Sequence, residues 1–213
     1  MTAPSTPAAP TDSSVRTRRA YFDCQFGQLH VRTAFPATGG FDEQVTLICV
    51  HPSTGAGASR VFSTFLPGIA DRRCVYAPDL PGYGESDPAT ATGVGAGTAA
   101  ILDLAAQLRL RRIDVLGLRD GCLVAMELAL AKPELVRRLV LTEAPASARG
   151  QLVEQPCLVL AIGAEAREAG ERGKPLPPNA QRIDVAERAA DPFGAAAPAL
   201  VRQCAQFLDR KRL

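Results

Sequence analysis

The chain has 213 residues, of which 46% are hydrophobic and 22% charged, a composition typical of a globular protein that buries a full core. Its 24 basic residues nearly balance 22 acidic ones, and the net charge of +2 gives no argument for a nucleic-acid or membrane partner. The six cysteines are scattered singly without metal-ligand spacing, which favours reduced core thiols. We therefore expect a cytoplasmic protein with no metal and no cofactor.

The first residues differ in composition from the rest of the chain. Residues 1–16 are rich in Pro, Ala, Ser and Thr and lack apolar periodicity, which predicts a disordered tail rather than a secretory signal. No internal repeat or linker divides the remainder of the chain, so residues 17–213 are predicted to form one domain.

The apolar patterns predict strands that alternate with helices. In chain order the predicted elements are a hairpin with strands 20–26 and 29–35 that breaks at Gly27 and Gln28, a strand over 45–50, a helix over 59–71, a strand over 73–80, a helix over 97–110, a strand over 113–118, a helix over 120–131, strands over 137–144, 156–163 and 181–187, and a helix over 194–210. This alternation is typical of βαβ units and a mostly parallel sheet.

Three short stretches carry the main functional signal. "LICVHP" (47–52) is a buried strand that ends in His-Pro, and "YAPDLPGYGESD" (76–87) is a strand followed by a turn dense in Pro, Gly and Asp. "IDVLGLRDG" (113–121) is a buried strand followed by a glycine-framed turn at the start of an apolar helix.

In this order and spacing, the stretches resemble the α/β-hydrolase family over most of residues 20–210. The resemblance implies a three-layer α/β sandwich with a mostly parallel sheet and an N-terminal hairpin. It also places the third stretch at the nucleophile elbow, the strand–turn–helix that presents the catalytic nucleophile.

The three family positions that would carry a catalytic triad hold other residues here. The nucleophile position is Arg119, whose guanidinium does not lose a proton and cannot attack a carbonyl. The position of the family acid is Ala166, one residue after Glu165, and that of the family histidine is Ala190. The resemblance therefore implies that hydrolysis by a Ser-His-Asp relay is lost.

The family's lid is also missing. Family members commonly insert tens of residues between the strands that correspond to 137–144 and 156–163, whereas only residues 145–155 join them here. An uncovered sheet edge is expected to leave apolar side chains exposed, which predicts self-association, as in a homodimer, or a protein partner.

Three functions remain open. The first is a catalytically degenerate protein that acts by binding, as a scaffold, regulator or sensor. The second is an esterase-like hydrolase with a relocated site around Ser53 and His51, or with carboxylates from Asp79, Asp87 and Glu143. The third is a structural subunit whose lidless face is an oligomer interface. Structural roles are favoured for His30, His51 and Ser53, and an inward-packed Cys122 is expected to be a poor nucleophile.

Arg119 itself has two interpretations. At a helix N-terminus, its guanidinium and the backbone N–H groups could bind a small anion or a carboxylate. Alternatively, Asp120, Glu143 or Glu165 could neutralise it and close the old pocket, and this ion pair is the favoured interpretation. The candidate binding residues are Arg119, Asp120, Ser53 and Thr54.

Overall fold

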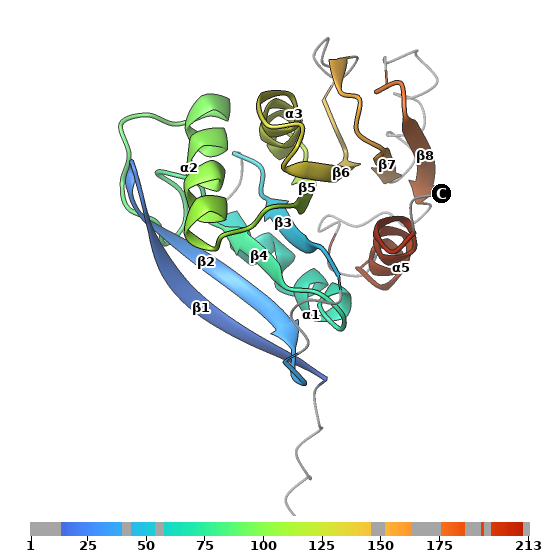
Figure 1. The fold of residues 1–213 in the computed structure, drawn as a ribbon, viewed down its shortest axis with the longest axis horizontal. Helices are drawn as coiled ribbons and strands as arrows, with labels where there is room; N and C mark the ends of the chain where they lie inside the picture. The colour runs from blue at the N-terminus through green and yellow to red at the C-terminus, as the bar shows by residue number, and fades with distance from the viewer. Residues whose placement is uncertain are drawn as a thin grey trace, which may run out of the picture.

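One sheet runs through the whole molecule (Figure 1). The computed structural model describes residues 14–39, 44–53, 58–145, 152–162, 176–185, 193 and 197–210. The strands are β1 (Val15–Cys24), β2 (Gly27–Pro36), β3 (Thr46–Val50), β4 (Val75–Pro78), β5 (Ile113–Leu118), β6 (Val136–Thr142), β7 (Cys157–Ile162) and β8 (Ala180–Val185). The helices are the 3₁₀ turn η1 (Ala58–Phe62), α1 (Phe65–Ile69), α2 (Val94–Gln107), α3 (Gly121–Ala131) and α5 (Ala197–Leu208).

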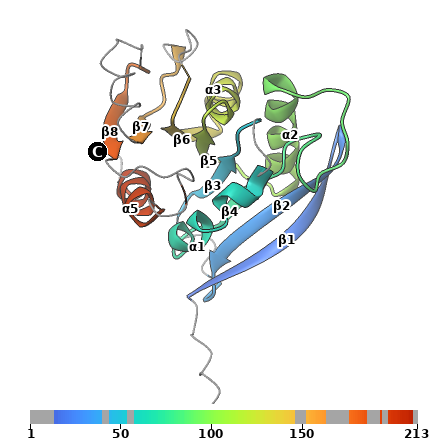
Figure 2. The ribbon, with the colours of Figure 1, turned by 180° about the vertical axis from the view of Figure 1, so that it is seen from behind.

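The order of strands across the sheet is β1-β2-β4-β3-β5-β6-β7-β8. The hairpin β1–β2 is antiparallel and joins β4 in antiparallel fashion, whereas all pairs from β4 to β8 are parallel. Helices α2 and α3 cover one face, and α1 and α5 cover the other (Figures 1 and 2). The predicted three-layer sandwich with a mostly parallel sheet and an N-terminal hairpin is confirmed.

Side-chain alternation along the central strands divides the core between the two faces. Leu47 and Cys49 of β3 pack with α1 and α5, while Ile48 and Val50 pack with α3. All six residues of β5 are buried, as expected for a strand covered by helices on both faces. The carboxyl ends of β3 and β5 are therefore held rigidly, and the residues after them are placed precisely at one edge of the sheet.

The hairpin differs from its prediction in length and in turn. β1 begins at Val15, so Val15 and Arg16 belong to a strand and not to the expected tail; residues 1–13 lie outside the described part. The turn is Gln25–Phe26, and Gly27 already pairs with Cys24 as the first residue of β2, at φ +107°. The segment "RTRR" lacked an apolar signal because β1 is an edge strand with mostly exposed side chains.

Two predicted helices have different bounds. The helix expected over 59–71 is divided into η1 and α1. Pro67 has no N–H to bond the carbonyl of Ser63, as a continuous helix would require. η1 ends in a turn in which the N–H and the hydroxyl of Ser63 donate to the Arg60 carbonyl oxygen at 3.0 and 2.7 Å. The helix expected over 97–110 begins three residues earlier, after Gly93 at φ +89°. Residues 186, 187 and 194–196 of the last predicted elements lie outside the described residues.

The cysteines are distributed over most of the fold as free thiols. Cys24 is half-buried in β1, and the others are buried: Cys49 in β3, Cys74 before β4, Cys122 in α3, Cys157 in β7 and Cys204 in α5. Burial raises the pKa of Cys157 and Cys204 to about 12. These thiols are therefore protonated and unreactive in the folded chain.

Candidate functional site

The turn between β5 and α3 has the geometry of an elbow. Arg119 adopts φ +52°, a left-handed conformation that is strained for a residue with a side chain. A Cβ on Gly117 would lie 2.6 Å from the Cα of Cys122, and one on Gly121 would lie 2.6 Å from the carbonyl oxygens of Val50 and His51. Only glycine fits at both positions, because the turn packs directly on neighbouring backbone.

The Arg119 side chain is held by one carboxylate. Its Nε donates to Glu143 Oε2 at 2.9 Å, and Glu143 follows the neighbouring strand β6 at the same edge of the sheet. The side chain of Arg119 is nevertheless 49% exposed, and that of Glu143 is 25% exposed. Of the three acidic residues predicted as partners of Arg119, Glu143 is the one that forms the ion pair in the described residues. The pair does not bury the arginine side chain.

Asp120 does not neutralise Arg119. Its carboxylate accepts the backbone N–H of Ser53 at 3.1 Å and the Ser53 hydroxyl. This contact ties the loop after β3 to the start of α3. Ser53 and Asp120 line a small pocket of about 90 Å³, together with apolar groups that include Leu80 and Tyr83.

Both ring nitrogens of His51 are used by the fold. Nδ1 bonds the carbonyl oxygen of Pro52 at 2.8 Å, and Nε2 accepts the N–H of Leu80 at 2.9 Å. Nε2 is therefore unprotonated in a neutral ring. Burial lowers the pKa of His51, and the carbonyl of Pro52 opposes this only in part. The ring thus has no free nitrogen to accept a proton from Ser53, so the structure does not bring these two together as nucleophile and base.

His30 and Asp79 form a second buried pair. His30 Nδ1 lies 2.9 Å from Asp79 Oδ2, and the same carboxylate accepts the N–H of Ser59 at 2.6 Å and of Glu85 at 2.8 Å. Burial would raise the pKa of Asp79, but these bonds outweigh it and lower the pKa below its ordinary value. Asp79 therefore ties together the hairpin, η1 and the turn after β4.

The other candidate residues serve the fold or lie outside the described part of the chain. Asp87 Oδ2 accepts the N–H of Gln28 at 2.9 Å, a bond between the turn and the hairpin. Cys122 is buried with its sulfur 3.1 Å from the Gly117 carbonyl oxygen, and burial raises its pKa far above the ordinary thiol value. Thr54, Ala166, Ala190 and Glu165 lie outside the described residues.

The apolar face expected around Arg119 can be compared with the described residues alone, and self-association through it stays a prediction. Among the described residues, the exposed large hydrophobic side chains are Tyr21, Leu152 and Leu176, and none of them is beside Arg119. Tyr21 lies in β1, and the two leucines precede β7 and β8, at the opposite edge of the sheet. In the same residues, no group of three His, Cys, Asp or Glu could hold a metal ion, and no helix is long and apolar enough to cross a membrane.

Sequence reasoning missed two features of this site. The contact between Ser53 and Asp120 joins segments 67 residues apart, and no local sequence pattern predicts it. Tyr83 packs edge-on against the ring of His51 with ring centroids 5.5 Å apart. Its signal in the sequence is its place in the turn 79–87, where the glycines and prolines account for the backbone but do not indicate a ring contact.

Comparisons with known proteins agree with this architecture. The model of the alpha/beta hydrolase fold family matches residues 45–212. The carboxylesterase CesB from Bacillus subtilis has a TM-score of 0.76 at 16% identity, covering 91% of this chain and 92% of that one. A predicted CIB-like hydrolase from Thermoplasma acidophilum has a TM-score of 0.76 at 14% identity, covering 91% and 98%.

Sequence relatives add a shorter match. Uncharacterized proteins of Mycobacterium tuberculosis and Mycobacterium bovis are 40% identical over 77 residues, which is 36% of this chain. The match spans 23% of the length of each relative. The structural likeness is below 25% identity and shows the fold, whereas the family model covers most of the chain. The protein therefore belongs to the alpha/beta hydrolase fold family.

Proposed function

We propose that this chain is a non-hydrolytic member of its family that works by binding, as a scaffold, regulator or sensor. The observation that carries the proposal is the residue at the elbow. Arg119 occupies the left-handed position from which a nucleophile would project, and its half-exposed guanidinium is paired with Glu143. A guanidinium binds oxygen anions and performs no nucleophilic attack.

The residues that could act as a general base also support a binding function. The chain has only two histidines, His30 and His51, and each is buried and bonded within the fold. The family resemblance places Ala166 and Ala190 at the positions of the acid and the histidine, and an alanine side chain offers no proton acceptor. A triad would need all three members in one hydrogen-bonded row.

The ligand that suits Arg119 bears a carboxylate. Only Nε of the guanidinium is bonded to Glu143, and its outer nitrogens have no bond to the described residues. A carboxylate accepts two parallel N–H bonds from the edge of such a group. An acidic side chain of a partner protein, including a second copy of this chain, or a small organic acid has this chemistry.

A hydrolytic alternative rests on Ser53. Its hydroxyl contacts Asp120 at the wall of the 90 Å³ pocket, so a carboxylate, rather than His51, is the group that could take its proton. The pocket beside this serine has an apolar lining, as sites that bind ester substrates commonly do.

Labelling with a fluorophosphonate probe distinguishes the two functions, because such probes react with activated serines. We expect no labelling of the purified protein above that of its heat-denatured control, measured by in-gel fluorescence. Labelling that disappears in Ser53→Ala and persists in Ser63→Ala would overturn the binding function and establish the Ser53 hydrolase. Turnover of a short-chain activated ester provides the second readout on the same variants.

A further inference from the structure

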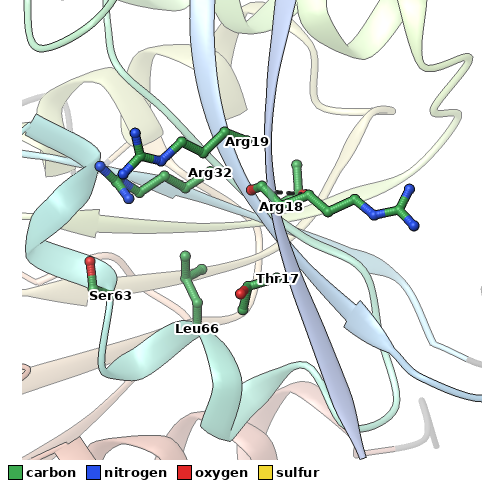
Figure 3. Close-up of a pocket in the computed structure, with 7 residues that line it drawn as sticks. Thr17, Arg18, Arg19, Arg32, Ser63 and Leu66 are labelled. Carbon is green, nitrogen blue, oxygen red and sulfur yellow. Dashed lines mark hydrogen bonds between the residues drawn. The ribbon is translucent and has the colours of Figure 1, made fainter. Parts of the chain in front are cut away.

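A second pocket lies far from the elbow, between the hairpin and the segment that leads into α1. It has a volume of about 380 Å³ and is lined by Thr17, Arg18 and Arg19 of β1, Arg32 and Thr33 of β2, and Ser63 and Leu66 from the η1–α1 segment (Figure 3). We call it the hairpin pocket. None of its residues takes part in the elbow site or in the function proposed above.

Two arginines are held together at this pocket by the strand register. Arg19 and Arg32 are directly opposite partners in the antiparallel pair β1–β2. Figure 3 shows their guanidinium groups side by side, on the side of the sheet that faces Ser63 and Leu66. Like charges directly opposite each other destabilise a strand pair, so an anion beside the two guanidinium groups would stabilise this arrangement.

The protein neutralises the positive charges of Arg19 and Arg32 only in part. Glu85 bonds Arg32 at 3.2 Å and Arg19 at 3.4 Å, both long for charged pairs, and its side chain is 42% exposed. One carboxylate thus serves two guanidinium groups and leaves one positive charge over. In addition, the Nε of Arg32 is buried without a hydrogen-bond partner among the described residues, and the Arg32 side chain is only 18% exposed.

We propose that the hairpin pocket binds the phosphoryl group of a small phosphate monoester. A phosphoryl group carries up to two negative charges and three terminal oxygens, enough to engage both guanidinium groups at once, which a carboxylate with two oxygens does less completely. The Thr17 hydroxyl is a further donor at the wall, and Leu66 offers apolar surface to the organic part of the ligand. Ser63 shapes the wall, because its hydroxyl already donates to Arg60.

The guanidinium pair of this pocket consists of Arg19 and Arg32, and the neighbouring Arg18 does not add its guanidinium to it. Successive side chains of a strand point to opposite faces, so Arg18 lies on the other side of the sheet from Arg19. Figure 3 shows Arg18 directed away from the pair, and its guanidinium lies over the ring of Phe35, 5.2 Å from the centroid. The geometry suits a compact ligand. Arg18 also lines the pocket, but its guanidinium is directed away from the pair, so its substitution is a matched control for the loss of a nearby positive charge.

Isothermal titration with inorganic phosphate and with phenyl phosphate, at constant ionic strength, tests the proposal. We expect saturable binding of both and weaker binding of acetate. Arg19→Gln, a change of a well-exposed side chain, should weaken phosphate binding by about tenfold or more, and Arg18→Gln should leave it within about twofold. Arg32→Gln, with its fold checked by circular dichroism, provides a second variant.

The variant Glu85→Gln should change the phosphate affinity in the opposite direction to Arg19→Gln. Removing the carboxylate that bonds Arg19 and Arg32 should tighten phosphate binding, because both guanidinium groups become available to the ligand and a repelling negative charge is lost. Absence of saturable phosphate binding, equal losses in Arg19→Gln and Arg18→Gln, or weaker binding in Glu85→Gln would each overturn the proposal.

Discussion

Arg119 combines the backbone of an elbow with a side chain that cannot act as a nucleophile. Its strained φ of +52° and its place at the start of α3 depend on the turn, and the glycines at 117 and 121 permit that turn. The side chain determines the chemistry that is presented there. With Glu143 bound to Nε, the outer nitrogens of the guanidinium are the ones that the proposed carboxylate ligand would contact.

Acetate is the simplest probe of this edge. We expect acetate to shift the NMR signals of the elbow amides in a saturable manner, and Arg119→Ala to abolish the shift without lowering the melting temperature appreciably, because the side chain is half exposed. Glu143→Gln should strengthen the effect by removing a competitor. Arg111→Ala, at an exposed arginine beyond α2, is the control. Shifts that persist in Arg119→Ala would refute a carboxylate site at the elbow.

For single residues, the sequence predicted the chemistry of a side chain better than its hydrogen-bond partner. The arginine at the elbow and the structural use of His51 followed from residue identity and motif position. The choice of Glu143 over Asp120 did not, because it depends on the register of β5 and β6, which brings residues 24 positions apart together. The pairing of Arg19 with Arg32 likewise required the hairpin register.

Among the elements, the strand–turn–helix of β5 and α3 is the most tightly constrained. Gly121→Ala should reduce the free energy of unfolding by about 1–3 kcal/mol or more, because its new Cβ would lie 2.6 Å from two backbone carbonyl oxygens that cannot easily move. Urea denaturation monitored by circular dichroism measures this loss.

Gly95→Ala is the matched control for that variant. Gly95 lies in α2, and nothing is within 4 Å of an added Cβ, so the change should be neutral or stabilise by up to about 1 kcal/mol. Equal stabilities for the two alanine variants would contradict the close packing of the elbow.

The elements themselves were predictable where burial sets the pattern. β5 has the predicted bounds of 113–118, since both of its faces are covered. The first half of β1 was missed because an edge strand needs no apolar alternation, and the predicted helix over 59–71 was interrupted by the missing N–H of Pro67. Both boundaries depend on backbone hydrogen bonds, and the pattern of apolar and polar residues does not reveal these bonds.

At the scale of the whole molecule, Asp79 connects segments that are distant in sequence. Asp79→Asn should lower the free energy of unfolding by about 2–4 kcal/mol at neutral pH, because the charged acceptor of bonds from His30, Ser59 and Glu85 is lost. Asp71→Asn, at an exposed position, should change it by less than about 0.5 kcal/mol.

The pH dependence of this difference results from the lowered pKa of Asp79. A carboxyl whose pKa is lower in the folded state stabilises the fold above its unfolded pKa of about 3.9, and this stabilisation is lost as the pH falls through the folded pKa. The gap between wild type and Asp79→Asn should therefore narrow below about pH 4 in urea titrations. A gap that is constant down to the lowest accessible pH would show that the charge of Asp79 is not what joins these segments.

The buried cysteines have a practical consequence for studying how the molecule opens. Cys49, Cys122, Cys157 and Cys204 each belong to a different element, and all are shielded from reagents while their element stays packed. A thiol can react only when its surroundings unfold locally. The chain thus contains its own set of position-specific reporters, from the central strand to the C-terminal helix. Alkylation rates measured by mass spectrometry would give the order in which its layers separate, without the introduction of a single label.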